Sequence, residues 1–267
     1  MEAQHLIKTN NMSLFIILVA FSLLSGGLAW YFIAHDHGEK EPIGALWAAA
    51  GLGLLGGVGA AILESAVLPI GNLQPGTALA ALFLASMGVG IIEEACKFIP
   101  LAALLYRKRY FNEHTDGVIY FAIAGLGFGL PENILYSLQF GAGVGLSRVI
   151  LTPFFHAATT GMVGYFLAKS KLAGRAWYQT APLALAVAMV LHGMYDFGLA
   201  SGVPLLIGLS ILITLGVSVS LFIFFSKAIG LDQARGLSVV GKNNFCRSCG
   251  QPNPARGLYC VHCGNHA

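Results

Sequence analysis

Seven long apolar segments dominate this sequence, and each is long enough to cross a lipid bilayer as an α-helix, which takes about 20 residues. Short stretches that hold most of the charged and turn residues separate them. The segments cover residues 12–34, 43–69, 79–106, 117–138, 149–168, 181–200 and 203–226. Because hydrocarbon offers no water to satisfy backbone polar groups, such segments must be internally hydrogen-bonded helices. We therefore predict an all-α polytopic membrane protein with about seven transmembrane helices.

The composition excludes an ordinary soluble domain. Of the 267 residues, 56% are hydrophobic and 10% are charged, whereas soluble domains carry about 25% charged residues. The mean hydropathy of +0.73 agrees. The net charge of +3 is small, and the basic residues lie at the ends of apolar segments rather than in one stripe. We therefore expect membrane lipid as a partner and no nucleic acid.

Lysine and arginine residues predict the orientation, since cytoplasmic loops carry an excess of them. With the N-terminus outside and the segments alternating, 12 of the 15 Lys and Arg residues fall on the inner side. Only Lys8 and Arg148 fall outside, and Lys97 lies within the third segment. We therefore predict a multi-pass protein with its N-terminus outside and its C-terminal tail in the cytoplasm.

Two segments carry acidic side chains at membrane depth, where an ionisable group is costly and usually marks a site. The third segment contains Glu93, Glu94 and Lys97. Glu93 and Lys97 are four residues apart and are expected to pair, whereas Glu94 points about 100° away and is expected to lack that partner. One paired and one free acid suit a general base. In the fourth segment Pro131 bends the helix beside Glu132, which favours function for this acid over a merely capped kink.

The fifth and sixth segments add two histidines and an aspartate. His156 lies in the fifth segment, and His192 and Asp196 lie one turn apart on one face of the sixth. Asp196 can fix the tautomer of His192, or both can bind a metal, with a structural hydrogen bond as the alternative. At ~1.5 Å per residue, these three side chains and Glu132 fall in the outer half of the membrane, whereas the acids of the third segment come out deeper.

The polar motifs follow one another in a fixed order along the chain. They are Glu93-Glu94-x-x-Lys97, Phe128-x-x-x-Glu132-Asn133, His156, and His192-x-x-x-Asp196. Over roughly residues 80–200 this pattern resembles the PrsW family of intramembrane proteases, distant relatives of the CAAX prenyl endopeptidases. The resemblance implies peptide-bond hydrolysis in membrane-anchored regulatory proteins on the extracytoplasmic side, with the ionisable residues of these motifs as the site.

The chemistry of peptide hydrolysis leaves two versions of this site open. Both need an activated water, a base and a group that stabilises the oxyanion. In the zinc version, which we favour, His156, His192 and either Glu132 or Asp196 hold a catalytic zinc, and Glu94 is the base. In the metal-free version Glu94 and His156 activate the water and His192 stabilises the oxyanion.

A separate cysteine-rich module at the C-terminus predicts a structural zinc site. Two Cys-x-x-Cys pairs are separated by ten residues, and their members are Cys246, Cys249, Cys260 and Cys263. Four thiolates at this spacing make a closed tetrahedral site, and the module resembles a zinc ribbon. Two disulfides, the alternative, fit poorly with a cytoplasmic tail.

The chain therefore divides into a transmembrane protease domain (1–226), a linker (227–244) and a zinc ribbon (245–267) that could recruit a cytoplasmic protein partner. Two other functions compete with the protease. A proton-coupled transporter would also use buried Glu, His and Asp residues, and a non-enzymatic scaffold would use the membrane domain to display the zinc ribbon. The compact grouping of the polar motifs and the lack of matched broken helices in two halves favour the protease.

Overall fold

The computed structural model describes residues 2–68 and 77–235, and within these ranges it contains helices and no strand. A short 3-10 helix, η2 (Trp177–Gln179), accompanies seven long helices, all long and apolar enough to cross a membrane. The long helices are α1 (Glu2–Ala34), α2 (Ile43–Val67), α3 (Leu79–Leu104), α4 (His114–Phe140), α5 (Ala142–Leu172), α6 (Ala181–Ala200) and α7 (Pro204–Ala234). The prediction of an all-α protein with about seven spanning helices is confirmed. The predicted zinc ribbon lies outside the described residues.

Four helices extend beyond the segments predicted from hydropathy, and α1 among them begins at Glu2 instead of residue 12. Helix α4 begins at His114 instead of 117, because Glu113 and Asp116 form a capping box there. Helix α5 begins directly after Gly141, whose φ of 87° ends α4 and turns the chain, whereas the prediction began at 149. Helix α7 runs to Ala234 and so takes up the first part of the predicted linker.

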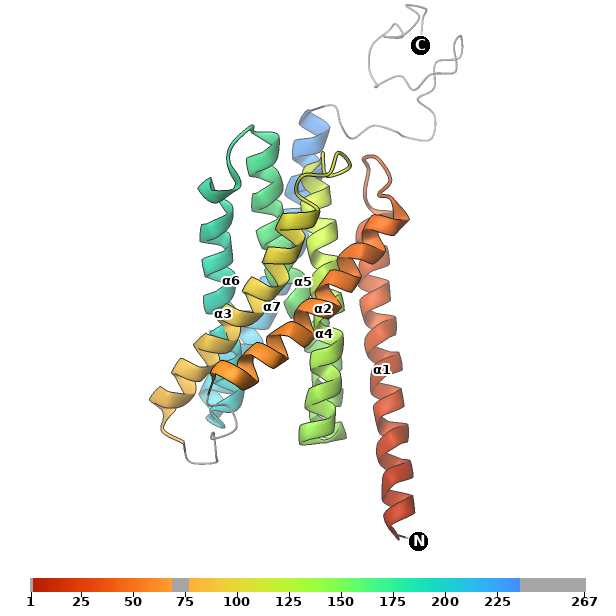
Figure 1. Ribbon diagram of the computed structural model, residues 1–267, viewed down its shortest axis with the longest axis vertical. Helices are drawn as coiled ribbons and strands as arrows, with labels where there is room; N and C mark the ends of the chain where they lie inside the picture. The colour runs from red at the N-terminus through yellow and green to blue at the C-terminus, as the bar shows by residue number, and fades with distance from the viewer. Residues whose placement is uncertain (1, 69–76, 236–267) are drawn as a thin grey trace, which may run out of the picture.

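Helices α4 and α5 form the centre of the bundle. In their most apolar stretches 67% and 78% of the residues are buried, against at most 33% in the other five. Helices α2 and α3 cross this centre diagonally, with α6 and α7 beside them (Figure 1). Close backbone approach makes the packing possible, since a Cβ at Gly125 of α4 would clash with the carbonyl oxygen of His156 on α5. The two most enclosed helices are therefore pressed together beside His156.

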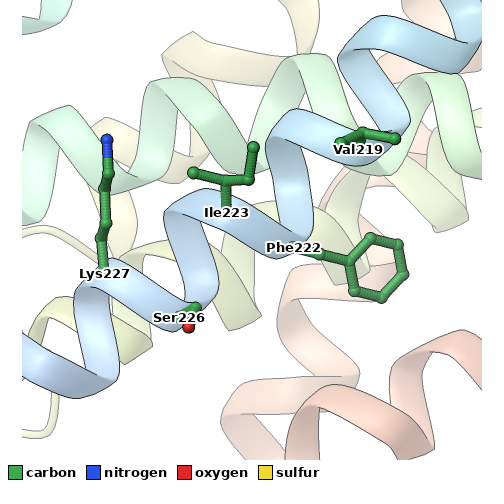
Figure 2. A pocket seen from close by; sticks show the side chains of 5 residues that line it. All are labelled: Val219, Phe222, Ile223, Ser226 and Lys227. Atoms are coloured by element: carbon green, nitrogen blue, oxygen red, sulfur yellow. The ribbon is translucent and has the colours of Figure 1, made fainter.

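The outer surface of the bundle is apolar, as a lipid-facing surface requires. Large side chains such as Trp47, Leu183 and Leu205 are 73%, 74% and 81% exposed. A surface hollow lies along α7 and is lined by Val219, Phe222, Ile223, Ser226 and Lys227 (Figure 2). It contains none of the site residues predicted from the sequence.

Acidic side chains gather where the α1–α2 connection, the N-terminus of α4 and the C-terminus of α7 meet at one end of the bundle (Figure 1). Burial desolvates them, and their mutual electrostatic repulsion adds to the cost. None of these acids was predicted as a site residue from the sequence. The loop-end acidic cluster consists of Asp36, Glu41, Glu113, Asp116 and Asp232.

Backbone N–H groups stabilise much of this cluster. Asp232 of α7 accepts hydrogen bonds from the backbone N–H groups of His114 and Thr115, at 2.8 and 2.9 Å. Asp116 accepts from the backbone N–H of Glu113 at 2.7 Å. These N–H groups belong to the first turn of α4 and have no partner within the helix. The acids therefore cap α4 and tie it to the end of α7.

The acids of the loop-end acidic cluster that lie outside the spanning helices hold their protons unusually tightly. Burial raises the pKa of Glu113 to about 7, and the neighbouring Asp116 and Asp36 raise this pKa as well. Burial also raises the pKa of Asp36 and of Glu41. The ammonium of Lys40 donates to the backbone carbonyl oxygen of Asp36 at 2.8 Å.

Candidate active site

Seven polar side chains from four helices converge inside the bundle, and their side chains are at most 14% exposed. All seven were predicted as site residues from the sequence, and the structure brings them together. This buried polar cluster consists of Glu93, Glu94 and Lys97 of α3, Glu132 of α4, His156 of α5, and His192 and Asp196 of α6.

Lys97 lies at the centre of the cluster. Its Nζ is 2.8 Å from Glu94 Oε1 and 2.9 Å from His156 Nδ1. It is also 3.4 Å from Glu93 Oε2 and 3.5 Å from His192 Nδ1. One buried cation therefore contacts side chains of three helices, which compensates its loss of hydration.

The two glutamates of α3 do not divide their roles as predicted. Lys97 contacts both of them, and it lies closer to Glu94 than to Glu93. The prediction that Glu94 lacks this partner was wrong, because residues three and four apart both face the same neighbour on a helix. Glu94 Oε1 also accepts a hydrogen bond from Thr159 at 3.1 Å and lies 2.8 Å from His192 Nδ1. Glu94 is therefore the more tightly held of the two acids.

His192 joins the acids of α3 to Asp196. Its Nε2 lies 3.3 Å from Glu93 Oε2 and 3.6 Å from Asp196 Oδ2. The expected one-turn proximity of His192 and Asp196 is present, although the distance is longer than a hydrogen bond. The ring of His192 thus faces a carboxylate on each side, Glu94 at Nδ1 and Glu93 at Nε2.

Glu132 is held by two basic side chains of α5. Its Oε2 lies 2.6 Å from His156 Nε2, and its Oε1 accepts a hydrogen bond from the Arg148 guanidinium. The guanidinium also stacks 3.9 Å from the ring centroid of Tyr136. Glu132 therefore fixes the ring of His156 on the side away from Lys97.

Arg148 also belongs to this site, although the distribution of basic residues predicted that it lies in an outer loop. It is 6% exposed and paired with Glu132. The helical spacing indicates that Arg148 belongs to the site, since Arg148, Thr152 and His156 follow one another at intervals of four residues. They therefore share one face of α5.

Glu93, His156 and His192 form the one group among the described residues that could hold a metal ion, with ligand atoms within 4.8 Å of one another. This triad shares both histidines with the expected set and has Glu93 in place of Glu132 or Asp196. Two imidazole nitrogens and one carboxylate oxygen are a donor set of catalytic zinc sites. Glu132 instead lies behind His156, in the position of a group that orients a metal ligand.

Comparison with known proteins finds relatives of this chain. The profile of the PrsW family intramembrane metalloprotease matches residues 41–227, a range that includes the whole buried polar cluster. Protease PrsW of Bacillus subtilis (strain 168) is 31% identical over 184 residues, covering 66% of this chain and 82% of the relative. Protease PrsW of Geobacillus kaustophilus (strain HTA426) is 30% identical over 190 residues, covering 66% and 79%. No solved structure matches the chain.

Proposed function

Because the chain belongs to the PrsW family of intramembrane metalloproteases, we propose that the buried polar cluster is its active site. The protein is a multi-pass membrane protease with seven helices long and apolar enough to span the bilayer. One observation carries the proposal. Ionisable side chains from four helices meet inside an apolar bundle and include a triad able to hold a metal. Such groups are costly at membrane depth and usually serve function.

The residues of the cluster fit a catalytic metal, and we propose zinc held by Glu93, His156 and His192. Three protein ligands leave a position open for water or substrate. A divalent metal held there would supply Lewis acidity for the scissile carbonyl and the attacking water.

Glu94 is the general base in this proposal. Thr159 and Lys97 both bind its Oε1, which fixes the carboxylate and leaves Oε2 to take a proton from the attacking water. The same oxygen then delivers the proton to the leaving amine. Glu132 orients His156, and Arg148 holds Glu132 in place. The positive charge of Lys97 favours the oxyanion that forms on the substrate carbonyl.

The substrate class follows from the surroundings of the site. The polar cluster lies within spanning helices whose outer faces are apolar, so a membrane-anchored protein segment can approach it through lipid. The distribution of Lys and Arg supports an N-terminus outside and a tail in the cytoplasm. Reporter fusions at both termini test this orientation, and a tail outside the cytoplasm would contradict it.

The cysteine-rich tail binds a second zinc in this proposal. The spacing of Cys246, Cys249, Cys260 and Cys263 supports a closed structural site, which could recruit a cytoplasmic protein partner. Replacing the four cysteines by serine is expected to remove this zinc and to leave cleavage by the membrane domain intact.

Metal analysis of the purified full chain tests the proposed site. We expect two zinc ions per chain, one after the four tail cysteines become serine, and none when His192→Gln is added. If the cysteine-free chain holds no zinc and still cleaves substrate after exhaustive chelation, the zinc version is wrong. Glu94 and His156 would then be the pair that activates water without a metal.

A further inference from the structure

The ammonium of Lys97 lies among the donors of the proposed metal triad. Its Nζ is 2.9 Å from His156 Nδ1, 3.4 Å from Glu93 Oε2 and 3.5 Å from His192 Nδ1. Glu93 and His156 are thus in direct reach of one cation that belongs to the chain itself. His192 Nδ1 donates to Glu94 Oε1 at 2.8 Å, so Nε2 is the nitrogen of this ring that is left for a metal. The ammonium of Lys97 therefore occupies a cation site formed by other side chains of the same protein.

Lys97 is held there by the polarity of the cluster. Its side chain is fully buried, so it has no water to replace these partners. Glu94 Oε1 binds the ammonium at 2.8 Å, and the ring centroid of Phe128 lies 4.1 Å from Nζ. Two carboxylates, the imidazole of His156 and an aromatic face together make a buried ammonium tolerable.

Lys97 and a metal cannot use these donors at the same time. The Nε2 of His156 faces Glu132 at 2.6 Å, so Nδ1 is the nitrogen that faces the triad. A neutral imidazole has one acceptor nitrogen with a single lone pair, which cannot accept from Lys97 and also bind a metal. The repulsion between an ammonium and a dication a few ångströms apart in a buried site opposes joint occupancy as well.

We propose that Lys97 is an internal competitor of the active-site metal. Its ammonium binds the triad in the metal-free protein and must withdraw, toward Glu94, before a metal binds. This inference rests on the metal triad of the proposed function. Lys97 thereby neutralises the buried acids when metal is scarce, and it lowers the metal affinity below what two histidines and a glutamate would otherwise give.

Zinc titration of the full chain tests the competition, with the four tail cysteines replaced by serine in every variant so that only the membrane domain binds zinc. Zinc affinity is measured by competition with a chromophoric chelator. Lys97→Met removes the ammonium at nearly constant length and is expected to bind zinc at least ~10-fold tighter than the parent chain. Lys97→Arg keeps the positive charge on a larger side chain and is expected to lose zinc binding. Lys227→Met, on the surface of α7, is the matched control and is expected to change nothing.

Adding His192→Gln to Lys97→Met is expected to abolish the tight binding, and tight binding that persists would place the zinc elsewhere and overturn the proposal. Equal or weaker binding by Lys97→Met would also overturn it. If Lys97→Met folds poorly, zinc should raise its thermal midpoint more than that of the parent chain. Zinc binding by Lys97→Arg equal to that of the parent would again contradict the competition. None of these outcomes depends on cleavage, so they do not test the role of Glu94 as base, which the cleavage assay tests separately.

Discussion

Two groups of buried acids in this protein are neutralised in different ways. In the buried polar cluster, basic side chains face the acids, with Lys97 between the glutamates of α3 and Arg148 against Glu132. In the loop-end acidic cluster, backbone N–H groups face most of the acids, as at Asp232 on the first turn of α4, where the ring of His114 also contacts Asp232. Side chains can move or exchange a proton or a metal, whereas backbone groups of a helix end are fixed. The first arrangement suits chemistry, and the second suits holding helix ends together.

The largest expected difference between the two clusters is in catalysis. Glu94→Gln should lower the cleavage rate by ~100-fold or more, because it removes the proposed base. Glu113→Gln is the matched change in the loop-end acidic cluster and should leave the rate per folded molecule nearly unchanged. Cleavage of a membrane-anchored substrate by reconstituted protein checks both. An equal loss of cleavage rate in the two variants would contradict the assignment of catalysis to the buried polar cluster alone.

Ion pairing within the buried polar cluster should dominate its stability. Arg148→Met leaves Glu132 buried without its cation and should lower the free energy of unfolding by about 3–5 kcal/mol. The double variant Arg148→Met/Glu132→Gln removes both charges and should recover most of this loss without recovering cleavage. Equilibrium unfolding in mixed micelles measures the stability. A double variant no more stable than Arg148→Met would show that the ion pair is not the cause.

Capping at the loop end should have a smaller effect, confined to stability. Asp232→Asn weakens hydrogen bonds from two backbone N–H groups and the 2.6 Å contact with His114 Nδ1. It should lower the free energy of unfolding by about 1–3 kcal/mol. The cleavage rate per folded molecule should stay the same, because Asp232 caps α4 through His114 and Thr115, neither of which belongs to the buried polar cluster. A rate loss at unchanged stability would assign Asp232 a role in catalysis.

The smallest expected effect is a pH dependence of stability from the loop-end acidic cluster. The pKa of Glu113 is about 7 in the folded protein and 4.5 in its ordinary state, so the folded chain binds the proton more tightly. This contribution is fully present below pH 4.5 and is lost as the pH rises through about 7. The thermal midpoint should therefore fall by a few °C between pH 6 and pH 8.

Glu113→Gln should make this pH dependence shallower without abolishing it, since Asp36 and Glu41 also have raised pKa values and contribute with the same sign. A midpoint that rises from pH 6 to pH 8 would contradict the proposed protonation of the cluster.

Several features of the site were predictable because they depend on single residues or short intervals. Each polar side chain of the buried cluster interrupts an apolar segment, which makes it visible without knowledge of its neighbours. Arg148 was missed because its position near a segment end fits a loop charge equally well. The loop-end acidic cluster was missed because Asp232 and His114 are 118 residues apart in sequence and meet only in the folded chain.

By itself, the sequence determined that the chain lies in a membrane, which segments span it and which polar residues need partners there. Each of these follows from the cost of placing a given residue in hydrocarbon. Only the tertiary structure decided the partners. It put Lys97 against His156, 59 residues away, and Glu94 against His192, 98 residues away. It also placed Glu93 with the two histidines in the proposed metal triad, and Glu132 behind His156. Such contacts depend on the tilt and rotation of whole helices, which their apolar composition leaves open.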